Sequence, residues 1–164
     1  RVGNGIDDSI QRALRAHLTP QPRVEFGRLV GARSLAHSMM DVSDGFAQDL
    51  SHICEESGVT AVIDFEAVPI ADEIALVAGS APKRFELAVS GGEDYELLLT
   101  ATPQNEDTLM CVARECEVKL TRVGEIVARD ASFSGSNSHV HLRRNDGSVA
   151  SLHTHGYDHF RAEI

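Results

Sequence analysis

Oxygen-bearing side chains crowd one short stretch of the sequence, at Asp41, Ser43 and Asp44, with Gly45 directly after them. Carboxylate oxygens are the ligands that Mg²⁺ and other hard cations prefer. If a helix begins here, its free backbone N–H groups and the positive end of its dipole also attract anions. This stretch could therefore hold a divalent cation on its carboxylates while Ser43 and the nearby amides meet the phosphate that the cation neutralises.

The same stretch, residues 41–45, is called the acidic turn below, and the sequence also permits a simpler role for it. Ser and Asp are the residues most often found at helix N-caps, so the local pattern alone favours a cap at Ser43 or Asp44. Asp41 argues for a ligand site, because one cap does not need a second carboxylate three residues earlier. Both roles are compatible with the local sequence.

A second candidate is the stretch Ser-Gly-Gly-Glu-Asp-Tyr-Glu-Leu at residues 90–97, called the Gly-Gly loop below. Its adjacent glycines permit positive φ and a close approach of the backbone to another group. Glu93 and Asp94 follow the glycines at once, so a ligand could lie beside two carboxylates. A hairpin turn with solvated acidic side chains is equally compatible with this pattern.

Two further clusters lie toward the end of the sequence. Imidazole groups can bind zinc, but neither a cysteine nor a repeated spacing joins the histidines, so we rank them below the carboxylates. The last cluster, residues 156–160, is aromatic in a chain that is only 5% aromatic, and the pattern alone favours packing of its side chains. The histidines concerned are His139, His141, His153, His155 and His159.

The hydrophobic pattern around the acidic turn predicts the elements that position it. Residues 34–40 are small and apolar and are expected to end in a short buried strand. Apolar residues at positions 46, 50, 53 and 54 give one helical face, which ends at Gly58. The acidic turn is therefore expected to connect a strand to a helix.

Similar patterns predict the remaining elements. Strands are expected over residues 60–65, 95–100 and 118–127, helices over residues 10–18, 71–78 and 104–115, and a hairpin around the Asn-Asp-Gly turn at 145–147. Residues 7–9 are expected to cap the first helix. Strands and helices that alternate in this way predict an α/β (α+β) fold, in which helices pack on a mixed β-sheet.

Composition limits the possible functions. A chain of 164 residues with 42% hydrophobic residues suits one domain. Its net charge of −10 repels phosphate backbones, which argues against nucleic acid as a partner. The sequence contains no apolar run of about 18 residues, as a membrane span requires, and no Cys-x-x-Cys pattern among its three cysteines. A cytoplasmic protein without a membrane partner is expected.

Taken together, the acidic turn, the Gly-Gly loop and residues 156–160 resemble the thiamine-monophosphate kinases in order and spacing. The Gly-Gly loop is the most specific of the three, whereas the acidic turn also resembles the wider aminoimidazole-ribonucleotide-synthetase superfamily. The resemblance implies the C-terminal domain fold of that superfamily. It also implies an ATP-dependent phosphotransferase of thiamine biosynthesis, which converts thiamine monophosphate to thiamine diphosphate with Mg²⁺.

The resemblance also implies a role for individual residues. Asp41 and Asp44 correspond to metal ligands, Ser43 to an ATP contact, Glu93 to a contact of the substrate, and Tyr157 to an aromatic neighbour of the thiamine. No residue is assigned a catalytic acid or base role. The acceptor is itself a phosphate with a second pKa of about 6 and is largely ionised near neutral pH, so a general base is not obligatory.

In this family a preceding domain supplies much of the nucleotide pocket and most of the dimer contact. The resemblance therefore implies that residues 1–18 are an inter-domain segment with the first helix and that residues 19–164 are the C-terminal kinase domain. We expect a homodimer for the full-length enzyme and little activity for this segment alone. Two alternatives stay open, namely a sibling ATP-dependent enzyme with another substrate and a non-catalytic module that binds a phosphorylated ligand.

Overall fold

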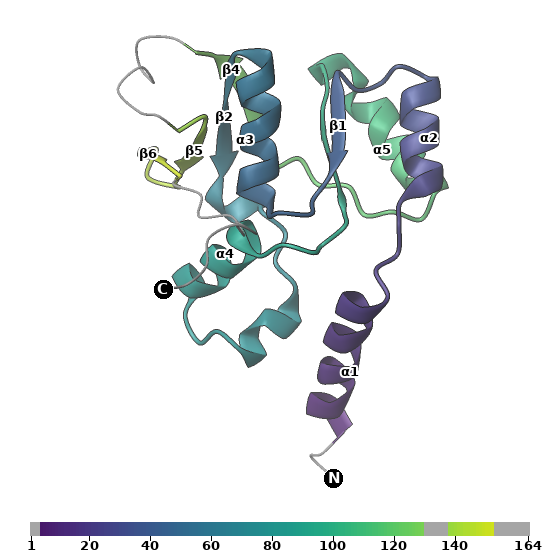
Figure 1. The fold of residues 1–164 in the computed structure, drawn as a ribbon, viewed down its shortest axis with the longest axis vertical. Helices are drawn as coiled ribbons and strands as arrows, with labels where there is room; N and C mark the ends of the chain where they lie inside the picture. The colour runs from purple at the N-terminus through teal and green to yellow at the C-terminus, as the bar shows by residue number, and fades with distance from the viewer. Residues whose placement is uncertain (1–3, 130–137, 153–164) are drawn as a thin grey trace, which may run out of the picture.

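The chain folds into two β-sheets flanked by helices, as a computed structural model shows for residues 4–129 and 138–152 (Figure 1). In the smaller sheet β1 (Ser38–Asp41) pairs with β3 (Leu97–Thr100) in antiparallel orientation. The larger sheet has the order β4-β2-β5-β6. Its strands are β2 (Val59–Asp64), β4 (Gly124–Ala128), β5 (Val140–Arg143) and β6 (Val149–Ser151). Because β2 is parallel to β5 and antiparallel to β4, this sheet is mixed, as predicted.

Helices cover both sheets. The α-helices of the described residues are α1 (Asn4–Leu18), α2 (Val24–Ala32), α3 (Phe46–Ser57), α4 (Ala81–Ser90) and α5 (Glu106–Glu115). Short 3₁₀ helices form at η1 (Phe65–Ala67), η2 (Asp72–Leu76) and η3 (Pro103–Asn105). In Figure 1, α3 and α4 lie beside the larger sheet, α2 and α5 lie beside β1, and α1 extends away from both. Among residues 4–129 and 138–152, no helix has the length and apolar character that crossing a membrane requires.

The β1–β3 ribbon lies between two hydrophobic cores because the side chains of a strand alternate between its two faces. Leu98 of β3 belongs to the core formed with α3, α4, β2 and β5. Its neighbours Leu97 and Leu99 pack against the other core, which α2 and α5 form. Packing on both faces fixes the ribbon, and with it the acidic turn at the end of β1 and the Gly-Gly loop before β3.

Most elements predicted near the site are confirmed. β1 runs directly into the acidic turn, although it is half-buried rather than fully buried. Helix α3 ends at Gly58, which adopts the left-handed conformation with φ +64° expected of a C-cap glycine. The predicted hairpin is present as β5 and β6, with Gly147 at φ +79° in its turn.

Other predictions need correction. Residues 7–9 lie inside α1 and do not cap it, because the helix begins earlier. Only the second half of the strand predicted over residues 118–127 forms, as β4. Val118 and Leu120 of the first half pack against the second core, so their apolar character reflects burial in a non-strand segment. The helix predicted over residues 71–78 is a 3₁₀ helix.

The sequence pattern also left two helices unpredicted. Helix α2 contains Gly27 and Gly31, which lower helix propensity. It forms because Phe26 and Val30 are buried on one face, and this packing stabilises the helix. Helix α4 begins with a proline in its first turn and buries Phe85 and Val89. Both features are ordinary signals of a helix start and an apolar face.

An ion-pair network across the larger sheet gives a prediction about pH. Arg143 donates two hydrogen bonds to Asp64, at 2.6 and 3.1 Å, and one to Glu125 at 2.7 Å. Hydrogen bonds from Arg143 hold the pKa of Asp64 below its ordinary value. A lowered carboxyl pKa stabilises the folded state above the unfolded pKa of about 3.9, and this contribution is lost as pH falls through the folded pKa.

We therefore expect Arg143→Gln to lower the melting temperature at about pH 7 and to have little effect on it at about pH 2. Thermal unfolding followed by circular dichroism between these two pH values measures the difference. The exposed neighbour Arg144 is joined to Ser148 and Gly147 through its backbone, and it supplies the matched control Arg144→Gln. A melting-temperature difference that stays constant with pH would contradict a role for the Arg143–Asp64 pair.

Candidate functional site

The structure brings the two sequence motifs together into one site. The backbone N–H groups of Glu93 and Tyr95 donate to the carbonyl oxygens of Ser43 and Val42, both at 2.8 Å. The N–H of Val42 in turn donates to the carbonyl of Glu96 at 2.9 Å. These hydrogen bonds extend the β1–β3 pairing past the end of the strands, so the acidic turn and the Gly-Gly loop form a single backbone unit.

Glycine allows the two motifs to approach this closely. A Cβ atom on Gly92 would lie 2.6 Å from the carbonyl oxygen of Ser43, and one on Gly45 would lie 3.1 Å from that of Ser90. Gly45 also has φ +126°, which side-chain-bearing residues rarely adopt. The Gly-Gly loop connects α4 to β3 and is therefore not a hairpin turn. Its glycines approach the protein's own backbone.

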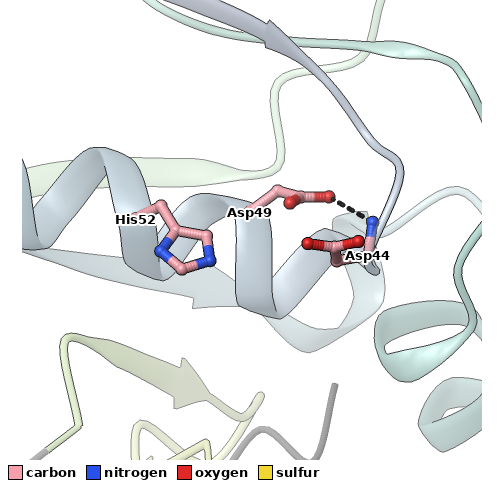
Figure 2. Close-up of side chains that lie close together, drawn as sticks. All are labelled: Asp44, Asp49 and His52. Carbon is pink, nitrogen blue, oxygen red and sulfur yellow. Dashed lines mark hydrogen bonds between the residues drawn. The ribbon is translucent and has the colours of Figure 1, made fainter. Parts of the chain in front are cut away.

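A buried carboxylate holds the acidic turn from the other side. Oδ2 of Asp49 accepts hydrogen bonds from the N–H groups of Ser43 at 2.9 Å, Asp44 at 3.1 Å and Gly45 at 3.3 Å. Figure 2 shows the second of these bonds. Only 1% of Asp49 is exposed. Asp49 comes from the first turn of α3 and therefore binds the backbone that leads into its own helix.

This arrangement corrects one expectation. Neither Ser43 nor Asp44 is the N-cap residue of α3, since that residue is Gly45, which makes no side-chain cap hydrogen bond. The amides of residues 43–45 already donate to Asp49 and are therefore not available to a phosphate. An anion at this position would have to displace a buried carboxylate, so the turn favours ligands that its side chains can bind.

Those side chains include donors suited to a metal ion. One ligand atom each from Asp44, Asp49 and His52 lie within 4.8 Å of one another, and Figure 2 shows the three side chains on the turn and the first part of α3. Asp44 is half-buried and His52 is exposed. Two carboxylates fit a hard cation such as Mg²⁺, and an imidazole also suits transition metals. Asp41, at the end of β1, is exposed and lies outside this group.

Sequence reasoning missed Asp49 and His52. For Asp49 a signal existed, because it lies three residues after Phe46 and one before Leu50, on the face of α3 that the apolar pattern predicts to be buried. A carboxylate on a buried face needs hydrogen-bond partners, and the acidic turn is the nearest source of free N–H groups. His52 is exposed and carries no comparable signal.

The acidic residues of the Gly-Gly loop are joined to the N-terminal part of the chain. Arg23 donates to both carboxylate oxygens of Glu96, at 2.9 and 2.6 Å. Glu93 is exposed, has φ +67°, and places Oε2 3.9 Å from Nδ1 of His17 in α1. Partial loss of solvation and the charge of Glu96 raise the pKa of Asp94 above its ordinary value. Side-chain contacts of Glu96 and Glu93 thus connect the Gly-Gly loop to Arg23 and to α1.

The remaining candidates take no part in this site as far as the structure describes it. Tyr157, like the histidines at positions 153, 155 and 159, lies outside the described residues. His141 is buried in β5, and this burial lowers its pKa. His139 lies 3.0 Å from the Arg129 guanidinium. Neither belongs to the group of potential metal ligands found among the described residues.

The chain is similar to several known proteins in sequence and in structure. The chain is 35% identical to the thiamine-monophosphate kinase of Haemophilus influenzae over 146 residues, which cover 88% of this chain and 42% of that protein. The thiamine-monophosphate kinase structure from Stenotrophomonas maltophilia K279a aligns with a TM-score of 0.72 and 33% identity, over 87% of this chain and 41% of that one. AaThiL complexed with AMPPCP and TMP aligns with a TM-score of 0.69 and 25% identity, over 93% of this chain and 42% of that one.

These matches define how much of a larger protein the chain represents. It spans about two fifths of the length of the curated relatives that it matches, or 42% for the Haemophilus influenzae protein. The family model described as "AIR synthase related protein, C-terminal domain" matches residues 3–135, which is most of the chain. The mixed sheet and its helices agree with that assignment. The chain therefore belongs to the family of AIR synthase related proteins, as a C-terminal domain.

Proposed function

We propose that this chain is the C-terminal domain of a thiamine-monophosphate kinase, an ATP-dependent enzyme that phosphorylates thiamine monophosphate to thiamine diphosphate. The observation that carries the proposal is the hydrogen bonding between the acidic turn and the Gly-Gly loop, for example from Glu93 N–H to the Ser43 carbonyl at 2.8 Å. The two most informative motifs of the sequence thereby form one site. Relatives named as thiamine-monophosphate kinases, at up to 35% identity, support it.

Mg²⁺ and two substrates follow from this proposal. Asp44 and Asp41 are the proposed metal ligands, and a bound Mg²⁺ would neutralise the charge that phosphoryl transfer develops on the phosphate oxygens. Ser43 is the proposed contact for ATP, and Glu93 for thiamine monophosphate. Tyr157 is proposed to lie beside the cationic thiazolium ring, which an aromatic face attracts. The relative complexed with AMPPCP and TMP supports the choice of ligands.

The domain arrangement is also a proposal. Residues 19–164 would form the C-terminal kinase domain, and residues 1–18 would connect it to a nucleotide-binding domain that contributes to a homodimer. The share of each relative that the chain covers, 42% for the Haemophilus influenzae enzyme, supports a second domain in the complete enzyme. The net charge of −10 supports an enzyme with no nucleic-acid partner, and the odd number of cysteines supports a cytoplasmic one.

Enzyme assays of two proteins test the proposal. We expect the full-length protein that carries this sequence to form thiamine diphosphate from ATP, Mg²⁺ and thiamine monophosphate, and the 164-residue chain alone to form little or none. Full-rate turnover by the chain alone would contradict a divided site. ATP consumption by the full-length protein only with a different phosphorylated or carboxylated acceptor would instead identify a sibling enzyme of the same superfamily.

A further inference from the structure

Hydrogen bonds engage nearly all of the backbone of the acidic turn. The N–H groups of residues 43–45 all donate to Oδ2 of Asp49, and the carbonyl oxygen of Gly45 accepts from the Asp49 N–H at 2.9 Å. The carbonyl oxygens of Val42 and Ser43 accept from the Gly-Gly loop. The turn is therefore held at both edges, by one buried side chain on α3 and by the backbone of the loop.

Because the backbone of the turn is engaged, a ligand can bind only to its side chains. Asp49 determines where these side chains lie. Three donors converge on one carboxylate oxygen, which fixes three successive peptide groups relative to the axis of α3. The middle one of these belongs to Asp44, whose carboxylate is the proposed metal ligand. Asp49 and His52 belong to the same helix, so the hydrogen bond to Asp49 fixes the position of Asp44 relative to both of them (Figure 2).

We propose that Asp49 is a positioning residue for the divalent cation of this site. Its buried carboxylate accepts from the three amides that lead into α3 and thereby holds the Asp44 carboxylate in a position to bind a cation. The inference rests on the proposed function, in which Asp44 binds Mg²⁺. Groups that orient a metal ligand typically affect metal affinity or activity by about 10–100-fold when they are replaced.

A purely structural role for Asp49 has different consequences. If its carboxylate only stabilised the start of α3, its replacement would lower the stability of the protein and leave cation affinity unchanged in the molecules that fold. A positioning role requires the affinity for the cation itself to fall. Direct measurement of cation binding, with a control variant that perturbs the same helix elsewhere, separates the two roles.

The decisive variant is Asp49→Asn. The Asn side chain keeps the shape of Asp49 and one oxygen acceptor, but a neutral amide oxygen is a weaker acceptor than a carboxylate. The matched control is Cys54→Ala. Cys54 is fully buried in the same helix, and within the described residues no hydrogen bond joins it to the acidic turn. Burial raises the pKa of the Cys54 thiol to about 11, so this side chain is a neutral core group.

The experiment titrates Mn²⁺ into the full-length wild type and both variants and follows free Mn²⁺ by electron paramagnetic resonance. We expect Asp49→Asn to weaken Mn²⁺ binding by about 10–100-fold and Cys54→Ala to leave it within about twofold. Equal affinity in the wild type and Asp49→Asn would overturn the proposal. It would also be overturned if Cys54→Ala weakened binding as much, or if the wild type bound no Mn²⁺.

A parallel assay distinguishes failure of this inference from failure of the proposed function. If the wild type forms no thiamine diphosphate, the proposed function fails, whereas the Mn²⁺ titration still compares the wild type with Asp49→Asn. If the wild type is active and Asp49→Asn has the same Mn²⁺ affinity and the same Mg²⁺ dependence of the rate, the proposed function stands and the positioning role of Asp49 does not.

Discussion

Asp44→Asn in the full-length protein is expected to lower the rate of thiamine diphosphate formation by more than about 100-fold at a fixed, moderate Mg²⁺ concentration. Of the proposed metal ligands, Asp44 is the one that lies beside other potential ligands. It is half-buried, and its ligand atom lies within 4.8 Å of those of Asp49 and His52. Replacing the carboxylate by an amide removes the charge that attracts Mg²⁺ but keeps the side-chain shape. The rate should recover in part at high Mg²⁺.

A matched substitution controls for the general effect of losing one carboxylate. Asp107 is exposed in the first turn of α5 and does not belong to the group of potential ligands, so Asp107→Asn should leave both the rate and its Mg²⁺ dependence unchanged. The measurement is the initial rate as a function of Mg²⁺ for the wild type and both variants. An Asp44→Asn enzyme with an unchanged Mg²⁺ dependence would rule out the metal role of Asp44.

Gly92→Ala is expected to destabilise the protein by about 1–3 kcal/mol, the usual cost of forcing an extra methyl group into a packed site. The new Cβ would lie 2.6 Å from the carbonyl oxygen of Ser43, which is backbone and cannot rotate away. Separation of the two segments would weaken the hydrogen bond from the Glu93 N–H to the same oxygen. Because Glu93 is the proposed substrate contact, the activity of the full-length protein should fall together with its stability.

Gly79→Ala provides the control for this substitution. A Cβ on Gly79 would meet no atom within 4 Å, and its φ lies outside the left-handed range, so the change should be neutral or slightly stabilising. Urea denaturation of the wild type and both variants gives the free energies of unfolding, and the rate assay gives the activity. Wild-type stability in Gly92→Ala would show that the two motifs do not need their observed close contact.

Asp49 and the acidic turn determine the charge that the site presents to a ligand. The amides of residues 43–45, which lead into α3, all donate to the buried carboxylate of Asp49 and are not available to a phosphate. The charge that such a site presents to a ligand is consequently negative, as the net charge of −10 for the chain would also suggest. A phosphate group would bind at this surface only together with a cation, because both the phosphate and the surface are negatively charged. This requirement is consistent with phosphoryl transfer from a Mg²⁺-bound nucleotide.

The local sequence was sufficient to predict the elements on either side of the acidic turn. Periodicity at positions 46, 50, 53 and 54 and the C-cap at Gly58 determine α3, because an amphipathic helix buries one face and ends where a residue can adopt positive φ. The Asn-Asp-Gly turn similarly determines the β5–β6 hairpin. These features depend on residues that are neighbours along the chain, so a pattern can reveal them.

Only the tertiary structure decided what holds the acidic turn. The sequence allowed Ser43 or Asp44 as a cap, but the N-cap residue is Gly45, and the amides of residues 43–45 donate to the side chain of Asp49. The contact between Gly92 and Ser43 joins segments that lie far apart in the sequence. Such contacts depend on the packing of the β1–β3 ribbon between two cores, and no local pattern encodes that packing, because hydrogen-bond partners distant in sequence are brought together only by the complete fold.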